Sequence, residues 1–595
     1  MIRYQITSHD PATHYFKVRI LIDNPDPEGQ CLRLPNWIPG SYMIRDFAKN
    51  LVTLDAYSDE QPLAIAQLDK SNWRVAPCSQ ALRVEYLVYA KDLSVRGAHL
   101  DHTHGYYNGA SVFLEVLGQS DSACEVLIEK PAADYCQKWK LATTLKRIDA
   151  GRFGFGLFRA QDYDELIDHP VEMGEFGQVH FEACGVPHDI ILSGQYRCDE
   201  ARLAQDLKTV CEHHIRFFGE PAPMDTYQFL VMVVGEGYGG LEHRSSTSLI
   251  CSRDSLPQPG QKEVSEDYRT FLGLCSHEYF HTWNVKRIRP AAYQPYALQQ
   301  EVYSELLWAF EGITSYYDDL ALVRTGLIDE SSYLELLAQT MTRVQRGLGR
   351  TRQSAAESSF NTWSKFYQQD ENAQNAIVSY YAKGALIALC IDLKMRELSD
   401  SSISLDEVMR SLWQNWCDTG AGVEADTIQN LVCTLVDNDL HEYMHQLIST
   451  TDELPLDESL AVVGVDVMRR QAANQKDKGG KPKKEPLPGA ELGAFLKERV
   501  GGLEILRVEE GGAAQLAGLS AGDTIVAINS LKQTLAQIEQ RLKFAQAGEQ
   551  WTIHAFRRDE LYCVELMLRP AQRHTIELAP TENHRQYRQS WLGGR

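Results

Sequence analysis

The stretch CSHEYFHTWNVKRIRP, residues 275–290, holds two histidines four positions apart, His277 and His281, with Glu278 directly after the first. Residues i and i+4 of a helix project from the same face, so both imidazoles can reach one metal ion. Glu278 is turned by about 100° from His277, where its carboxylate can accept a proton from a water molecule. The spacing therefore predicts a helix that carries a metal site and its general base.

A third metal ligand is expected further along the chain, because a hydrolytic zinc keeps three protein ligands and leaves the fourth position to water. The candidates are Glu301, Glu305 and Glu311. Glu311 lies in LWAFEGITSYY, among apolar and aromatic residues, where a buried carboxylate is costly without a cation. Glu301 and Glu305 are expected on a solvated face. We therefore predict one Zn²⁺ per chain, bound by His277, His281 and Glu311.

The signature HEYFHTWNVKRIRP, followed thirty residues after His281 by Glu311, resembles the M61 family of metallopeptidases, the glycyl aminopeptidases. The resemblance extends to GGLEHRSST at Gly239 and YYAKGALIAL at Tyr380. It implies a thermolysin-like α/β catalytic domain that removes small N-terminal residues, such as glycine or alanine, from peptides. A looser similarity to M1 aminopeptidases departs in spacing, because Gln300 occupies the position of their third zinc ligand.

The stretch QFLVMVVGEGYGGLEHRSSTSLI, residues 228–250, predicts a strand, a glycine-rich turn and a second strand that starts near Gly240. An extended substrate can bind along such a strand edge, so Gly239 and Gly240 are predicted to contact it. The resemblance implies that Glu242 holds the free α-ammonium group of the substrate. His243 replaces an asparagine of the comparable M1 motif, and its role stays open.

Tyr381 lies in YAKG, a stretch that resembles the motif whose tyrosine stabilises the oxyanion in M1 enzymes. A phenol is a neutral hydrogen-bond donor at pH 7, and the adjacent Tyr380 is an alternative. The leading hypothesis is thus a zinc-dependent aminopeptidase. The alternatives are a zinc endopeptidase whose protein substrates are selected by a C-terminal domain, and a scaffold protein without catalytic activity.

The chain is expected to form a multidomain α+β protein. Alternating apolar and polar residues predict an N-terminal all-β domain, whereas helical spacing dominates from about residue 200. QAANQKDKGGKPKKEPLPG, residues 471–489, is too rich in lysine, glycine and proline to form a core. It predicts a mobile linker or an exposed loop from Gln471 to Leu487. The predicted segments are a β-rich domain at 1–165, the catalytic domain at 166–455, a connection at 456–487, a compact module at 488–575 and a tail at 576–595.

GGAAQLAGLSAGDTIVAIN, residues 511–529, resembles PDZ domains of the bacterial protease type. The resemblance implies a domain that binds extended peptides or C-termini by adding a strand to its sheet. The loop that receives the carboxylate is predicted at Glu491, Leu492 and Gly493. Because every residue proposed for the zinc and substrate site precedes Gln471, the chain from Gln471 onward is expected to be dispensable for hydrolysis of dipeptide-sized substrates.

The overall composition argues against some partners. Lys+Arg 59 against Asp+Glu 81 gives a net charge of -22, a poor surface for nucleic acid or anionic lipid. No basic segment followed by an apolar run opens the chain, and no run approaches the ~18 apolar residues of a membrane span, so a cytoplasmic protein without membrane contact is expected. The cluster His99, Asp101, His102 and His104 is expected to form a polar turn rather than a metal site.

Overall fold

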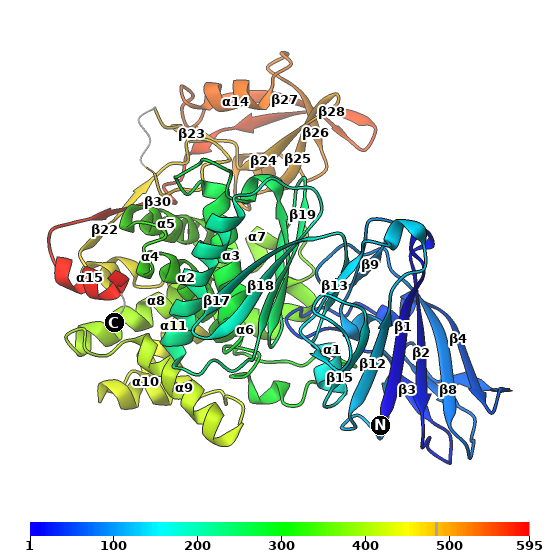
Figure 1. Ribbon diagram of the computed structural model, residues 1–595. Helices are drawn as coiled ribbons and strands as arrows, with labels where there is room; N and C mark the ends of the chain where they lie inside the picture. The colour runs from blue at the N-terminus through cyan, green and yellow to red at the C-terminus, as the bar shows by residue number, and fades with distance from the viewer. Residues whose placement is uncertain (482–485, 594–595) are drawn as a thin grey trace. The chain divides into compact units, whose positions relative to one another are not determined.

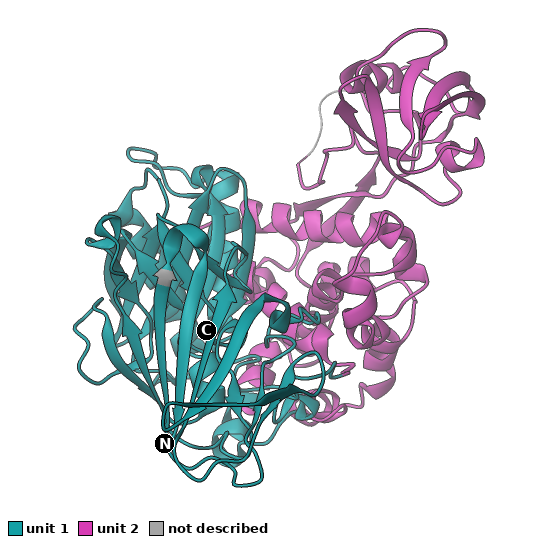
Figure 2. Cartoon of the chain, turned by 90° about the vertical axis from the view of Figure 1, so that its right-hand side faces the viewer, with its two compact units in different colours: residues 1–302, 412–423 teal, residues 303–411, 424–595 magenta. Residues whose placement is uncertain are grey.

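The computed structural model describes residues 1–481 and 486–593. It divides into two compact units, of which the first comprises residues 1–302 and 412–423 and the second residues 303–411 and 424–595 (Figure 2). The predicted catalytic domain is thus divided: its strands and the histidine helix belong to the first unit, and most of its other helices belong to the second. Residues 482–485 of the predicted linker lie outside the described residues.

The N-terminal domain is all-β, as the alternating pattern predicts. In β2 the residues Phe16, Val18, Ile20 and Ile22 are buried, and each is separated from the next by a partly exposed residue. This period of two places one face of the strand against the core. Eight strands form one sheet in the order β14-β15-β12-β1-β2-β8-β4-β5, and two sheets of four strands complete the domain.

The bounds of these strands are β1 (Ile2–Asp10), β2 (Tyr15–Ile22), β3 (Cys31–Arg33), β4 (Leu51–Ser58), β5 (Gln61–Leu63), β6 (Ile65–Gln67), β7 (Asn72–Val75), β8 (Leu82–Tyr89), β9 (Ala98–Leu100), β10 (His104–Tyr107), β11 (Glu115–Val116), β12 (Cys124–Glu129), β13 (Lys140–Ala142), β14 (Lys146–Arg147), β15 (Gly156–Ala160) and β16 (Val171–Gly174). The short helix α1 (Tyr163–Ile167) lies between β15 and β16.

A five-stranded sheet follows in the first unit, in the order β17-β18-β19-β21-β20. β19 runs parallel to both of its neighbours, and β20 pairs antiparallel at the edge. The strand predicted near Gly240 is in fact two strands, β20 and β21, so Glu242 ends the edge strand. The elements labelled in Figure 1 are β17 (Gly177–Ala183), β18 (Val186–Ser193), β19 (Tyr227–Val234), α2 (Glu200–Phe218) and α3 (Glu266–Phe280). The other two strands are β20 (Tyr238–Glu242) and β21 (Ser246–Ser252).

The second unit is built around the apolar helix α8, which packs against the π-helical turn η7, α4, α5, α6, α11 and α12. The stretch Ala373–Leu398 is long and apolar enough to cross a membrane, but 78% of its apolar window is buried inside the protein, as in the core helix of a globular domain. The helices are η7 (Trp308–Ile313), α4 (Thr314–Arg324), α5 (Glu330–Arg346), α6 (Ala355–Phe360), α7 (Ala373–Ala376), α8 (Tyr380–Leu398), α9 (Leu405–Thr419, divided between the units), α10 (Thr427–Val436), α11 (His441–Ser449) and α12 (Leu456–Val462).

A small β domain within the second unit has its own core, which includes Ile505, Trp551 and Ile553. Its sheet has the order β24-β25-β26-β27-β28, and the short strands β23 (Ala490–Glu491) and β29 (Arg569–Pro570) pair beside it. The remaining elements are β24 (Ala494–Arg499), β25 (Gly502–Val508), α13 (Ala513–Leu516), β26 (Thr524–Ile528), α14 (Leu535–Leu542), β27 (Gln550–Arg557) and β28 (Glu560–Met567).

The predicted C-terminal tail is structured and belongs to the helical part of the second unit. β30 (Thr575–Pro580) pairs antiparallel with β22 (Val465–Arg470), and helix α15 (Arg585–Gly593) follows. Trp591 is 0% exposed, and its indole N–H donates to the hydroxyl of Tyr316 (2.8 Å). The small β domain is therefore inserted between two paired strands.

The first half of the predicted linker is also held in place. Asp477 is buried and forms an ion pair with Arg470, in which Nη1 and Oδ2 are 2.5 Å apart. The backbone N–H of Gly480 donates to the carbonyl of Ile576 (2.9 Å). This segment is held in place by a buried ion pair and by backbone contacts of its glycines, although its composition cannot form a core.

We predict that excision of residues 471–574, with an Asn-Gly turn joining Arg470 to Thr575, leaves a folded protein, whereas truncation after Arg470 does not. Arg470 and Thr575 are paired across the ribbon, so a two-residue turn can connect them. Truncation also removes Trp591, and loss of a buried tryptophan costs about 3–5 kcal/mol. Thermal unfolding followed by circular dichroism compares the two variants. Equal melting temperatures would contradict a structural role for β30 and α15.

Candidate metal and peptide site

Helix α3, in the first unit, positions the two histidines predicted to bind the metal ion, His277 and His281. Ser265 caps its N-terminus by accepting from the backbone N–H of Tyr268, and His281 is its C-cap residue. The imidazole centroids of His277 and His281 are 4.6 Å apart. Nδ1 of His281 lies 2.6 Å from the carbonyl oxygen of Asn284 and donates to it, so the lone pair that can ligate an ion is on Nε2. Such a backbone contact fixes the tautomer that ligates a metal, so the residues fit a metal ion.

Glu278 lies against the backbone of the edge strand. Its carboxylate is buried (5% exposed), and a Cβ placed on Gly240 would lie 2.0 Å from its Oε1. Only a glycine permits this approach of β20 to α3. The carbonyl of Gly240 accepts from Nη2 of Arg96 (3.2 Å), an arginine of the N-terminal domain. Gly240 is thus explained by the space that Glu278 needs, whereas a Cβ on Gly239 would meet Ile250 and Arg96 at ordinary contact distances.

Glu242 brings a second buried carboxylate to the same place. It is 4% exposed, and ligand atoms of Glu242, Glu278 and His281 all lie within 4.8 Å of one another. A Cβ on Gly40 would lie 2.4 Å from Oε1 of Glu242, and Gly40 has a φ of +91° that favours glycine. Among the described residues, Oε1 of Glu242 has no hydrogen-bond partner. The site therefore holds a buried carboxylate that can bind a cationic group.

A buried ion network lies directly beside Glu242. Nζ of Lys286 is 2.7 Å from Oδ1 of Asp168, which also faces Nδ1 of His243 at 3.4 Å. Burial would lower the pKa of Lys286, but the carboxylates of Asp168 and Glu242 raise it above its usual value. Burial likewise opposes ionisation of Asp168, yet Lys286, His243 and Arg244 hold its pKa well below the usual range. Both partners are therefore charged at neutral pH, and His243 belongs to this network.

The second unit holds the predicted third metal ligand, Glu311, and the predicted oxyanion donor, Tyr381. Glu311, 2% exposed, lies on the π-helical turn η7, a distortion that is frequent at functional sites. The next residue, Gly312, packs on Gly384 of YAKG, and a Cβ on Gly312 would lie 2.5 Å from the Cα of Gly384. The two glycines allow η7 and α8 to touch through their backbones. They hold Glu311 and Tyr381 in a fixed relation within this unit.

The two tyrosines of YYAKG differ in their surroundings. Tyr380 is fully buried, and its hydroxyl lies 2.9 Å from Oγ1 of Thr362. Burial raises the pKa of Tyr380, and Tyr367 and Glu311 raise it further. Tyr381 is partly exposed, with its hydroxyl 3.4 Å from that of Tyr367. Tyr381 is therefore the tyrosine that a substrate can reach.

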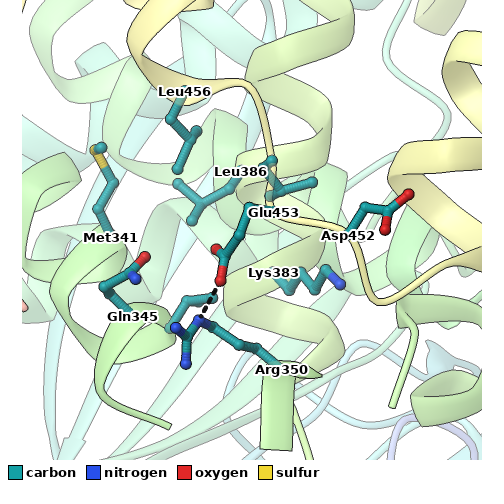
Figure 3. A pocket seen from close by; sticks show the side chains of 10 residues that line it. Met341, Gln345, Arg350, Lys383, Leu386, Asp452, Glu453 and Leu456 are labelled. Carbon is teal, nitrogen blue, oxygen red and sulfur yellow. Dashed lines mark hydrogen bonds and ion pairs between the residues drawn. The ribbon is translucent and has the colours of Figure 1, made fainter. Parts of the chain in front are cut away.

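Lys383 of YAKG lines a small cavity within the second unit. The cavity measures about 20 Å³, and an ion pair crosses it, in which Nε of Arg350 donates to Glu453 (3.1 Å; Figure 3). That volume holds about one water molecule. Nζ of Lys383 donates to the carbonyl of Thr450 (3.4 Å), and burial lowers its pKa. Lys383 is therefore structural, and this cavity is too small for a peptide.

The other sequence candidates lie apart from this chemistry. Glu305 is exposed and Glu301 partly exposed. In the 99–104 segment Asp101 accepts from the backbone N–H of Thr103 and of His104, as in a polar turn. The predicted loop Glu491–Leu492–Gly493 lines a pocket of about 160 Å³ in the small β domain. Sequence reasoning missed Gly40, Arg96 and Asp168, which lie far from the motif along the chain. The dipeptide Pro39–Gly40 was a signal for a tight turn, but nothing indicated its partner.

A helix with two histidines beside buried carboxylates is the site of a metal-dependent hydrolase. A family model described as the peptidase M61 N-terminal domain matches residues 3–175, and one described as M61 glycyl aminopeptidase matches residues 270–387. A solved structure of an aminopeptidase N family protein from Idiomarina loihiensis is 43% identical, covers 100% of both chains and superposes with a TM-score of 0.96. The chain belongs to the M61 peptidase family and is a metallo-aminopeptidase.

More distant matches are M1 zinc metallopeptidases from Deinococcus radiodurans. One is 14% identical, with a TM-score of 0.47 over 76% of this chain and 94% of that chain. Another, a mutant bound to a Tyr-Ser-Ala substrate, is also 14% identical, with a TM-score of 0.46 over 76% of this chain and 94% of that chain. No curated protein matches the sequence.

We predict that Lys286→Met destabilises the protein by about 3 kcal/mol, since it leaves the buried Asp168 with less compensating charge. Asp168→Asn in the same chain should restore part of the loss. The pKa of Asp168 is depressed in the folded state. Ionised Asp168 therefore stabilises the wild-type fold fully above the pKa of about 4 that an aspartate has in the unfolded chain, and this stabilisation is lost as the pH falls below that value. Urea unfolding at pH 7 measures the free energies. The control Lys262→Met, at an exposed lysine, should change stability by less than about 0.5 kcal/mol.

Proposed function

We propose that the protein is a zinc-dependent aminopeptidase that binds one Zn²⁺ through His277, His281 and Glu311. The observation that carries the proposal is the convergence of His281, Glu278 and Glu242 in a buried region of the first unit. Two imidazoles and one carboxylate form a donor set that zinc prefers in hydrolytic sites. The burial of Glu311 supports its assignment, because a buried carboxylate needs a cation.

The residues of this chain take separate parts in the reaction. Zinc, when bound, supplies positive charge that acidifies a water molecule and polarises the peptide carbonyl. Glu278 accepts the proton of the attacking water and delivers it to the leaving amine. The hydroxyl of Tyr381 donates a hydrogen bond to the oxyanion that develops on the carbonyl. The backbone of β20 at Gly239 and Gly240 offers an edge on which the substrate extends.

Glu242 sets the cleavage position in this proposal. An α-ammonium group has a pKa near 8 and is mostly charged at pH 7, so the buried carboxylate can fix the end of the peptide. The unpartnered Oε1 of Glu242 supports this role. Gly40 lies directly against that carboxylate. The preference for small N-terminal residues, glycine or alanine, rests on the family resemblance alone.

Two other functions fit these observations less well. An endopeptidase would need space beyond Glu242 for residues that precede the scissile bond, and the close approach of Gly40 argues against it. A scaffold without catalysis would need no general base, yet Glu278 is buried beside His281. A cytoplasmic location stays a prediction from the sequence.

We further propose that the small β domain is PDZ-like and binds extended peptides or C-termini. Glu491, Leu492 and Gly493 line its pocket together with Arg507 and Arg346. Gly493 has a φ of +68°, a left-handed backbone conformation that favours glycine in a tight turn. Burial raises the pKa of Glu491 to about 7, so this carboxyl group is partly neutral where a peptide carboxylate would arrive.

We predict that Glu311→Ala loses zinc, while Glu278→Gln keeps zinc and loses turnover. The amide of glutamine preserves shape but cannot accept a proton, so activity should fall by about 10²-fold or more. Zinc per chain is measured by atomic absorption after dialysis. Glu301→Ala is the control for the third ligand and should retain one zinc. Stoichiometric zinc in Glu311→Ala would exclude Glu311 as a ligand.

We predict that Glu242→Ala lowers kcat/KM for free-amine peptides. The expected loss of transition-state stabilisation is about 2–4 kcal/mol, the cost of removing one partner of a desolvated charge pair. Wild type should not cleave N-acetylated versions of the same peptides. Hydrolysis of glycyl and alanyl peptides is followed by mass spectrometry. Cleavage of acetylated peptides at internal bonds, at rates comparable with the free amines, would establish the endopeptidase alternative.

A further inference from the structure

The edge strand of the small β domain borders a groove. Among the strands of the described residues, β24 pairs with β25 on one side only, and helix α14 packs beside it. Between them lies the pocket of about 160 Å³, whose apolar lining includes Leu492, Leu496, Ile538 and Leu542. We call this the β24–α14 groove. An unpaired strand edge beside an apolar groove is where an added peptide strand binds in β-augmentation.

The open edge of β24 is already engaged by the chain itself. Oε1 of Gln475 accepts from the backbone N–H of Leu496 (3.0 Å), and Nε2 of Gln475 donates to the carbonyl of the same residue (2.6 Å). In an antiparallel ladder, a residue of an added strand exchanges this same pair of hydrogen bonds with its opposite residue. One carboxamide thus takes the place of one peptide residue at the centre of the edge.

The segment that carries Gln475 is fixed at both sides of the groove. The backbone N–H of Gln475 donates to the carboxylate of Glu539 on α14 (3.2 Å). Two residues further on, Asp477 is buried, pairs with Arg470, and accepts from the backbone N–H of Ala473 (2.9 Å). The turn around Asp477 therefore holds residues 472–475 against the groove while its anchor lies outside the groove.

We propose that Gln475 is an internal competitor of peptide binding: residues 472–475 close the β24–α14 groove, and a peptide must displace them to add a strand to β24. The inference rests on the proposed peptide-binding role of this domain. The occupant that displaces Gln475 is an extended peptide with an apolar C-terminal residue and a free carboxylate. The apolar lining and Arg346 and Arg507 at the pocket fit that chemistry.

The experiment measures binding of a fluorescein-Gly-Ser-Gly-Ser-Val-Val peptide with a free C-terminus to the full-length protein, by fluorescence anisotropy. The label acylates the N-terminus, so the probe is a poor aminopeptidase substrate. Gln475→Ala removes both hydrogen bonds to Leu496, and Gln475→Glu keeps the length but cannot donate to its carbonyl. Gln475→Ala should bind the probe about 30-fold more tightly than wild type and Gln475→Glu about fivefold more tightly, since each lost hydrogen bond contributes about 1 kcal/mol.

The matched control is Gln374→Ala, a glutamine of the same pocket whose amide donates to the backbone of Arg346 instead. It should bind the probe as wild type does. Hydrogen exchange of the Leu496 amide is a second measurement, and it should be faster in Gln475→Ala than in wild type.

Equal probe affinity of wild type and both Gln475 variants would overturn the competitor role and leave peptide binding intact. No binding to any variant would overturn both the competitor role and the proposed peptide-binding function. Hydrolysis of glycyl peptides should stay unchanged in all three variants, and it reports separately on the proposed aminopeptidase activity.

Discussion

The crowding of negative charge around the end of α3 is the constraint on which the site depends. Glu242 and Glu278 are both buried, and their carboxylates lie within 4.8 Å of one another and of His281. Two desolvated carboxylates so close repel each other strongly unless cations compensate them. Lys286 supplies part of that charge beside Glu242. The negative charge that Lys286 does not compensate can bind a metal ion and a substrate ammonium group, which are the two cations that an aminopeptidase must bind.

The site also depends on glycines that let the main chain lie directly against neighbouring groups. Gly240 gives Glu278 its space, Gly40 does the same for Glu242, and Gly312 meets Gly384 between η7 and α8. Each of these glycines permits a contact in which a methyl group would overlap its neighbour. The acids are thereby held by main chain, which moves less than side chains do. Such rigid support is what a preorganised site requires.

The sequence allowed much of this arrangement to be predicted, for identifiable reasons. The i, i+4 period of His277 and His281 and the apolar context of Glu311 are local signals, and so is the alternation that builds β2. Asp168, Arg96 and Gly40 could not be found, because their significance arises only when segments far apart in the chain fold together. The first half of the predicted linker is exposed at its lysines, but its attachment could not be foreseen: Asp477 is buried against Arg470, and Gly480 bonds to Ile576, which is far away in the chain. The tail could not be recognised as part of the helical core, because Trp591 carries no periodic pattern that reveals its burial.

The ribbon formed by β22 and β30 also has a consequence for biosynthesis. The helical part of the second unit is completed by residues that follow the inserted β domain, among them Trp591. During translation this helical part cannot reach its final packing until the last residues have left the ribosome, whereas the small β domain can fold earlier on its own core. A nascent chain that stops shortly before its end would thus carry a finished β domain on an unfinished helical body, and the apolar surface left uncovered around Tyr316 would mark it for chaperones and proteases.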